Sequence, residues 1–200
     1  MKLSAVFSVI LLTGCALTPK PAPVSIYDLG SIPVTAPGFA QFSPAAIQVA
    51  DISAPVWLDT EAIRYRLAYH DPARVYTYAN SHWTAPPAKL LTEYLRQYLA
   101  GHRLNPPGNS KYNRSLTNCL LKINLDEFMQ VFDTQNSSHV VIRLRAFLYE
   151  PDTHQPIAQH SFTIAQSAQT ADAAGAVAAF ILASDNLRSE LVQWLSGSRQ

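Results

Sequence analysis

The sequence predicts a single α/β (α+β) domain with a largely antiparallel sheet and two long helices on one face of that sheet. Three strand-like segments followed by a helix-like segment occur twice along the chain, giving two βββα-like passes. Short connections separate most of these strands, and short connections favour antiparallel neighbours. Hydrophobic residues make up 48% of the 200 residues and charged residues only 14%, so the chain can bury a substantial core.

The first pass opens with segments rich in β-branched and aromatic residues, which are typical of strands. These segments cover residues 46–52, 63–69 and 75–79. His70-Asp71-Pro72-Ala73 is a plausible hairpin turn between the last two. A helix is predicted from Pro86 and Pro87 to Gly101, because leucine and tyrosine recur along it at three- and four-residue spacing. The polar residues 104–118 then predict a long loop.

The second pass repeats this order. Strands are predicted at residues 119–131, 139–150 and 157–164. In the middle strand Arg143 and Arg145 alternate with aliphatic residues, so one side of the sheet should be at least partly wet. A final helix is predicted from about Thr170, a candidate N-cap, to Leu195. Its apolar residues at helical spacing should be buried: Val177, Ile181, Leu187 and Leu191.

Residues 1–14 have the features of a lipoprotein signal peptide. Lys2 supplies a positive charge, and the apolar run that follows is shorter than the roughly 18 residues that span a membrane. Leu12, Thr13 and Gly14 form the large-small-small pattern that a lipoprotein signal peptidase recognises, and the thiol of Cys15 is the predicted lipidation site. The alternative is an ordinary secretory signal followed by a chance cysteine.

The residues after the signal predict where the mature protein resides. Ala16 follows the cysteine in place of the aspartate that commonly retains lipoproteins in the inner membrane, so we expect an anchor on the periplasmic face of the outer membrane. Residues 15–24 contain three prolines and predict a lipidated tether that reaches at most ~30 Å. Residues 25–197 are the expected folded domain. Cys119 is then the last free thiol, and a buried, inert cysteine is favoured over a redox site.

The sequence contains no pattern typical of a catalytic, metal or cofactor site. Nucleotide-binding, serine-hydrolase, metalloprotease and dithiol motifs are all missing, and the six histidines include no pair at helical spacing for a metal. Asp126 and Glu127 are neighbours, which on a regular strand would point to opposite faces; a strand end or a bulge accounts for them better than shared acid/base chemistry. A net charge of +1 argues against nucleic-acid binding. We therefore expect no enzyme and no cofactor apart from the lipid on Cys15.

An aromatic cluster on the predicted hairpin is a candidate partner surface. It consists of Tyr65, Tyr69, Tyr76, Tyr78 and Trp83. Amphipathic aromatic rings are frequent in interfaces, but the sequence favours cross-strand aromatic pairs that complete a sheet packed on the following helix.

Several stretches of the mature chain, in this order, resemble one known family. They are Tyr27-Asp28-Leu29-Gly30, Ile47-Gln48-Val49, Pro55-Val56-Trp57-Leu58-Asp59, Ile63-Arg64-Tyr65-Arg66, and Tyr78-Ala79-Asn80-Ser81-His82-Trp83-Thr84-Ala85-Pro86-Pro87, which leads into a leucine-rich helix. In these stretches the chain resembles the ABC-type transport auxiliary lipoproteins, which include the lipoprotein of paraquat-inducible intermembrane transport systems.

The resemblance implies a non-enzymatic envelope component that contributes to membrane integrity. Such a component would work with a periplasm-spanning MCE-type protein and an ABC transporter to move lipids between membranes. Two alternatives remain open: a lipid-binding or assembly lipoprotein of another outer-membrane machine, and a periplasmic hydrolase whose site is assembled from scattered residues. A homo-oligomer is also compatible with the sequence.

Overall fold

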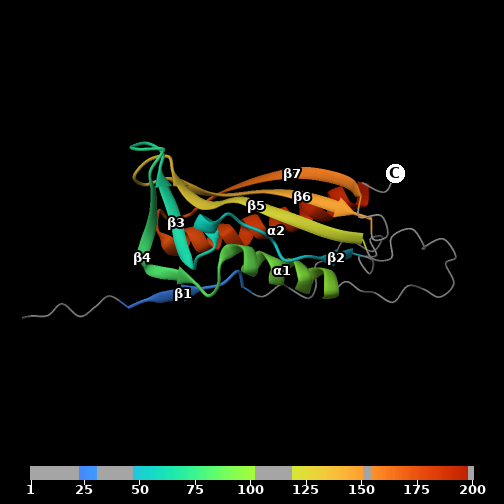
Figure 1. Ribbon diagram of the computed structural model, residues 1–200. Coiled ribbons are helices and arrows are strands. Elements are labelled where there is room, and N and C mark those ends of the chain that lie inside the picture. The colour runs from blue at the N-terminus through green and yellow to red at the C-terminus, as the bar shows by residue number, and fades with distance from the viewer. Residues whose placement is uncertain (1–22, 31–46, 102–118, 151–154, 198–200) are drawn as a thin grey trace, which may run out of the picture.

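Two helices lie against one face of a long sheet in the computed structural model (Figure 1). The structure describes residues 23–30, 47–101, 119–150 and 155–197. The strands are β1 (Ser25–Tyr27), β2 (Ile47–Val49), β3 (Ala62–Leu67), β4 (Val75–Trp83), β5 (Cys119–Phe132), β6 (Ser138–Tyr149) and β7 (Pro156–Ser167). The helices are α1 (Pro87–Gly101) and α2 (Ala173–Gly197), and the 3-10 helix η2 (Val56–Leu58) precedes β3.

The sheet is mixed and mostly antiparallel, as predicted. Its strand order is β1-β4-β3-β5-β6-β7, and β2 pairs with β5 beside this path. The hairpin pairs β3–β4, β5–β6 and β6–β7 are antiparallel, whereas β1–β4, β2–β5 and β3–β5 are parallel. The two passes are therefore β2-β3-β4-α1 and β5-β6-β7-α2, and the parallel pair β3–β5 joins them into one sheet.

Side-chain alternation along the long strands explains why the helices cover only one face. In β6 the residues Val140, Ile142 and Leu144 are fully buried toward the helices, while Arg143 and Arg145 are exposed on the other side. The predicted apolar residues of α2 pack into the same core, with Val177, Leu187 and Leu191 buried and Ile181 packed against them. The hydrophobic core thus lies between the sheet and the helices.

The start of α2 corrects one prediction. Thr170 is not the N-cap; Asp172 is, because its Oδ1 accepts the backbone N–H of Gly175 at 2.7 Å. The hydroxyl of Thr170 instead donates to the same Asp172 oxygen at 2.8 Å. A Cβ at Gly175 would collide with the backbone oxygen of Thr170, so this turn requires glycine. The N-cap therefore lies two residues later than predicted, and the helix begins at Ala173.

A bulge in β5 confirms one of the two explanations that the sequence offered for Asp126 and Glu127. The register with β6 shifts between Leu125 and Glu127, so Asp126 and Glu127 do not point to opposite faces as they would on a regular strand. Asp126 pairs with Arg145 at 2.9 Å, and Glu127 pairs with Arg143 at 2.9 Å. Both carboxylates lie on the outer face of the sheet, where each is neutralised by an arginine, and this arrangement is an ion-pair ladder.

Candidate functional site

The predicted aromatic cluster is partly assembled on the β3–β4 hairpin. The ring of Tyr65 stacks on Tyr76 at 5.2 Å and contacts Tyr78 at 4.7 Å and Phe132 at 5.6 Å, measured between ring centres. Tyr69 is exposed in the turn that follows β3. Three of the five predicted aromatic residues therefore form one half-buried stack, and a fourth lies at the tip of the hairpin.

Trp83 does not belong to that surface. Its side chain is 1% exposed and packs edge-on against Phe128 and Phe180, with ring centres 5.7 and 5.6 Å away. It ends β4 directly beneath α2, where a large apolar side chain fills the core between the layers. The prediction that Trp83 belongs to a partner surface was therefore wrong, because its place at the end of β4 puts its side chain between the sheet and α2.

Buried hydrogen bonds fix the tyrosine stack to the rest of the domain. The hydroxyl of Tyr78 donates to Oε1 of the fully buried Gln130 at 2.7 Å. Gln130 Nε2 in turn donates to Ser138 Oγ at 2.8 Å and to the backbone oxygen of Asp172 at 3.4 Å. Burial also raises the pKa of the Tyr78 phenol. The hairpin is thus held against the N-terminus of α2, and Gln130, a polar residue at a core position of β5, is the residue that sequence reasoning missed.

The opposite face of the hairpin carries cationic and exposed apolar side chains. Side chains alternate along β3, so Arg64 and Arg66 point away from Tyr65. Arg64 lies over the ring of Trp57 at 5.7 Å. Trp57 is 43% exposed, and Val56 beside it is 89% exposed.

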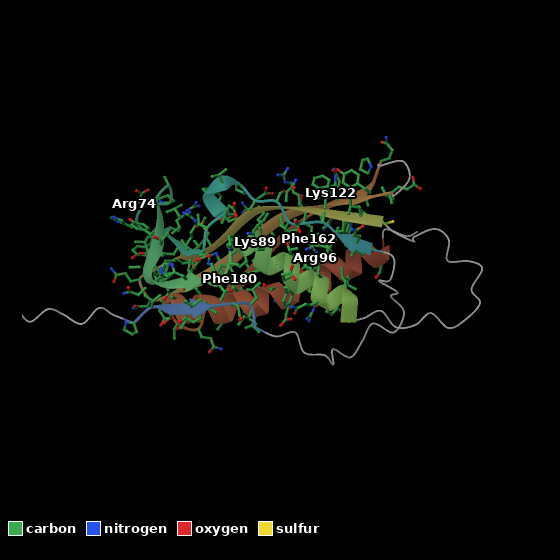
Figure 2. The ribbon with its side chains drawn as sticks, turned by 60° about the horizontal axis from the view of Figure 1, so that its bottom comes forward. Arg74, Lys89, Arg96, Lys122, Phe162 and Phe180 are labelled. Carbon is green, nitrogen blue, oxygen red and sulfur yellow. The ribbon has the colours of Figure 1, made fainter. Side chains whose placement is uncertain are left out.

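These two arginines have no anionic partner among the described residues. None of the ion pairs found there involves Arg64 or Arg66, and the Nε atoms of both are buried without a hydrogen bond. Arg74 is exposed beside the turn between β3 and β4 (Figure 2). Its guanidinium lies over the ring of Tyr76, 4.7 Å from the ring centre. We call the set Val56, Trp57, Arg64, Arg66, Tyr69, Arg74 and Val75 the hairpin end. It combines unpaired positive charge with exposed apolar surface.

An open groove of about 760 Å³ lies beside the first turns of α1. Its floor is apolar and is formed by Leu29, Ile52, Ala54, Ala85, Ala88 and Leu90. Its rim carries the charged residues Asp28, Asp51, Asp59, Lys89 and Glu93. Three segments far apart in sequence meet here: the end of β1, the stretch between β2 and β3, and the start of α1. Sequence reasoning missed the groove, although it contains residues from three of the stretches that carry the family resemblance.

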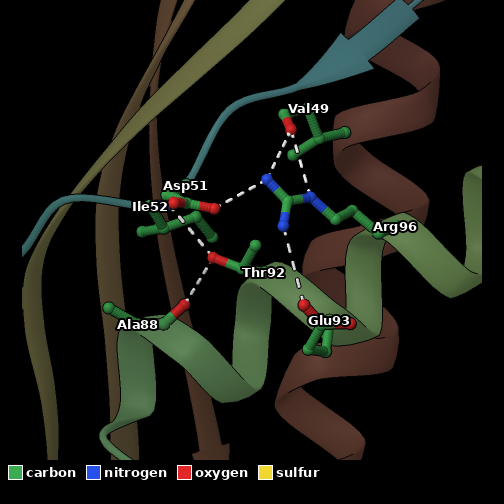
Figure 3. Close-up of polar contacts among 7 residues, drawn as sticks. All are labelled: Val49, Asp51, Ile52, Ala88, Thr92, Glu93 and Arg96. Carbon is green, nitrogen blue, oxygen red and sulfur yellow. Dashed lines mark hydrogen bonds and ion pairs between the residues drawn. The ribbon is translucent and has the colours of Figure 1, made fainter.

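Hydrogen bonds fix one wall of the groove to α1 (Figure 3). Arg96 donates to the backbone oxygen of Val49 through Nε and Nη2, at 3.2 and 3.0 Å, and its Nη2 donates to Asp51 Oδ1 at 2.7 Å. Thr92 Oγ1 accepts the backbone N–H of Ile52 at 3.0 Å and donates to the backbone oxygen of Ala88 at 2.7 Å. The chain after β2 is therefore clamped onto the helix.

Neither region has the arrangement of a catalytic or metal centre. The described part of the chain contains no group of three or more His, Cys, Asp or Glu side chains that could hold a metal ion. The residues that line the groove include Ser53 but no histidine, and Ser53 Oγ donates to Asn124 Oδ1 at 2.6 Å. Cys119 is buried as predicted. Within the described ranges, no helix is long and apolar enough to cross a membrane.

The predicted lipidation site and its recognition sequence cannot be placed in the structure. Cys15 and the preceding Leu12, Thr13 and Gly14 lie outside the described residues. The lipid anchor therefore stays a prediction from the sequence.

Comparisons with known proteins find both a family and a fold. A model of the ABC-type transport auxiliary lipoprotein component matches residues 27–192. A crystal structure of a Xanthomonas campestris protein of family DUF330 has a TM-score of 0.70 at 23% identity, covering 87% of this chain and 96% of that one. A crystal structure of an uncharacterized protein has a TM-score of 0.62 at 15% identity, covering 87% and 99%. At these identities both structures support the fold alone. No curated protein matches this chain.

Proposed function

Because this chain belongs to the family of ABC-type transport auxiliary lipoprotein components, we propose that it docks a transport partner at the outer membrane. In this proposal Cys15 carries the lipid, residues 1–14 are the cleaved signal peptide, and residues 25–197 form the domain on the periplasmic face. The partner is a periplasm-spanning MCE-type protein of an ABC-type system that moves lipids between membranes. The lipoprotein itself turns over no substrate.

The short distance that the anchored domain can reach from the membrane is the physical reason for a docking role. A tether of at most ~30 Å joins the lipid to β1, which pairs with the end of β4 at the sheet edge. A compact domain of this length has a radius of gyration of about 16 Å. Tether and domain together therefore cover only part of an envelope gap, and the longer component has to come to the lipoprotein.

The hairpin end is the observation that carries the proposal. Tryptophan, tyrosine and arginine dominate the binding energy of many interfaces, and the hairpin end contains all three types: Arg64 lies over Trp57, and Tyr69 is exposed in the turn after β3. The hydrogen bonds from Tyr78 through Gln130 to α2 hold this end in place. Because this end is already ordered, binding a partner there costs little free energy for the ordering of side chains and loops, and this favours affinity.

The two alternative functions have less support. A hydrolase would need a nucleophile, a base and an acid at bonding distance, and the groove supplies Ser53 and carboxylates without a histidine among its described residues. An assembly lipoprotein of another outer-membrane machine would use the same anchor with a different partner. Identifying the bound partner separates that alternative from the proposal.

Charge reversal at the hairpin end tests the proposal. Arg64→Glu and Arg74→Glu should weaken copurification of an MCE-type protein, and Tyr76→Ala should do the same by loosening the stack. Lys122→Glu is the matched control, since it reverses a charge on the sheet eight residues, ~26 Å, along β5 from the residue that pairs with Tyr65. If all three hairpin variants recover the partner as the unaltered protein does, the dock lies elsewhere.

A further inference from the structure

We infer that the groove beside α1 binds a segment of a partner protein in which an apolar side chain is flanked by lysine or arginine. This site is separate from the hairpin end, and it does not depend on docking there. The inference rests on three properties of the groove: fixed walls, an apolar floor and an acidic rim.

The walls are fixed before any ligand binds. Arg96 and Thr92 tie the stretch from Val49 to Ile52 onto α1, with four hydrogen bonds to backbone or carboxylate groups of that stretch. On its other side, Ser53 exchanges backbone hydrogen bonds with β5: its N–H donates to Ile123 at 3.0 Å, and its oxygen accepts from Leu125 at 2.8 Å. A preformed site avoids the free-energy cost of ordering its own walls on binding.

The floor is suited to an apolar side chain. Leu29, Ile52 and Ala88 are buried at its base, and Ala54, Ala85 and Leu90 extend it. Ligand-binding pockets in proteins are concave, are lined mostly by apolar side chains, and have volumes of about 300 to 1,000 Å³. A volume of about 760 Å³ leaves room for more than one apolar side chain.

The rim gives the groove a negative charge. It holds four carboxylates, those of Asp28, Asp51, Asp59 and Glu93, against Lys89 and the adjacent Arg96. Arg96 already contacts Asp51 at 2.7 Å and Glu93 at 3.6 Å (Figure 3). Asp28 and Asp59 take part in no ion pair among the described residues. A concave surface lined by charge of one sign concentrates ligands of the opposite sign.

This charge favours a peptide over a lipid. The phosphate of an anionic phospholipid would lie against the carboxylates of Asp28 and Asp59. A bare acyl chain would cover the floor but would desolvate those carboxylates without pairing them, which is costly. A segment with lysine or arginine on either side of an apolar residue satisfies both the floor and the rim.

Site-specific photo-crosslinking in living cells, with the full chain, tests the inference. A benzophenone amino acid replaces Gln97, which lines the groove and is exposed, or Glu190, which is exposed on α2 outside it. Mass spectrometry then maps the crosslinked atoms. We expect a higher yield of crosslinked adduct from position 97 than from position 190. The adduct from position 97 should map to a partner segment with an apolar residue next to lysine or arginine.

Neutralising the rim provides the second readout. The double variant Asp28→Asn with Asp59→Asn should lower the adduct yield about tenfold, as expected for the loss of two charge pairs. Asparagine at position 28 keeps the oxygen that accepts the Gly30 N–H at 2.8 Å, so the turn is preserved. The control double variant Asp133→Asn with Glu190→Gln should leave the yield unchanged.

Several results would overturn the inference. These are adducts to lipid, adducts within residues 31–46 of the same chain, adducts to a segment without basic residues, or no adduct above the Glu190 level. An adduct yield that is the same with and without the double substitution Asp28→Asn and Asp59→Asn would also overturn it.

Discussion

The hydroxyl of Tyr94 on α1 donates a hydrogen bond to the carboxylate of Asp185 on α2, with 2.5 Å between the two oxygens. Arg188, also on α2, donates to the same hydroxyl at 3.2 Å and pairs with Asp185 at 2.9 Å. Its guanidinium lies 4.7 Å from the ring centre of Tyr98. Because α1 ends the first pass and α2 ends the second, this cluster gives the two halves of the domain a directional contact in addition to apolar packing.

Removing the Tyr94 hydroxyl should destabilise the domain modestly. Tyr94→Phe should lower the free energy of unfolding by about 1 kcal/mol, the usual net contribution of one hydrogen bond, since Asp185 keeps its ion pair with Arg188. Urea unfolding followed by circular dichroism measures the change. Tyr69→Phe, at an exposed turn position, is the control and should be neutral. Equal effects of the two substitutions would mean that the contact between the helices contributes no stability.

The same phenol predicts a loss of stability at high pH. Burial raises the pKa of Tyr94 above its ordinary value of 10.0, and the hydrogen bond to Asp185 adds to this. The unfolded chain therefore ionises first, so the stabilisation is fully present below pH 10 and is lost as the pH rises toward the higher pKa of the folded state. Unfolding free energies measured at several pH values above 9 should fall less steeply in Tyr94→Phe than in the unaltered protein. Parallel pH profiles would contradict the assignment.

Two leucines of α2 test the burial of its apolar side. Leu187 is 1% exposed, whereas Leu182 is 50% exposed. Leu187→Ala should lower the free energy of unfolding by about 2 to 5 kcal/mol, because it leaves a cavity in the core. Leu182→Ala should change it by less than about 0.5 kcal/mol. A near-zero effect of Leu187→Ala in denaturant titrations would mean that α2 turns a different side to the sheet.

The lipid anchor is tested at Cys15. Cys15→Ala should abolish incorporation of labelled palmitate and should release the protein from outer-membrane fractions on a density gradient, because the thiol that receives the lipid is gone. Cys119→Ala is the matched control and should leave both properties intact, since Cys119 is buried in β5. A Cys15→Ala protein that still takes up label and sediments with the outer membrane would refute the anchor.

The elements that could be predicted are those with a strong local pattern. Alternation in β6 and helical spacing in α2 identified both elements, and short connections identified the antiparallel hairpins. Together they are sufficient for the fold class. Local pattern fails for β1, which has only three residues and is defined by its parallel pairing with β4. A local pattern also cannot predict that β3 pairs with β5, because this pairing joins segments about 65 residues apart in sequence.

The candidate sites were harder to predict for the same reason. The tyrosines of the hairpin all fall between Tyr65 and Tyr78, on two strands joined by a short turn, so the sequence predicted most of the cluster. The burial of Trp83 depends on Phe180, which comes from α2. The groove depends on the side-by-side placement of Asp28, Ile52 and Ala88, which no local pattern encodes. For Asp126 and Glu127 the sequence left open a strand end or a bulge, and the strand register shows the bulge, which turns both residues to one face.

The most direct test of the docking role is an affinity pull-down from detergent-solubilised membranes, with the full lipidated chain as bait and quantitative mass spectrometry as readout. The account predicts that an MCE-type protein is enriched with the unaltered chain and with Lys122→Glu, and that Arg64→Glu reduces this enrichment. Failure to recover any MCE-type protein with the unaltered chain, at bait levels equal to those of the variants, would contradict the account.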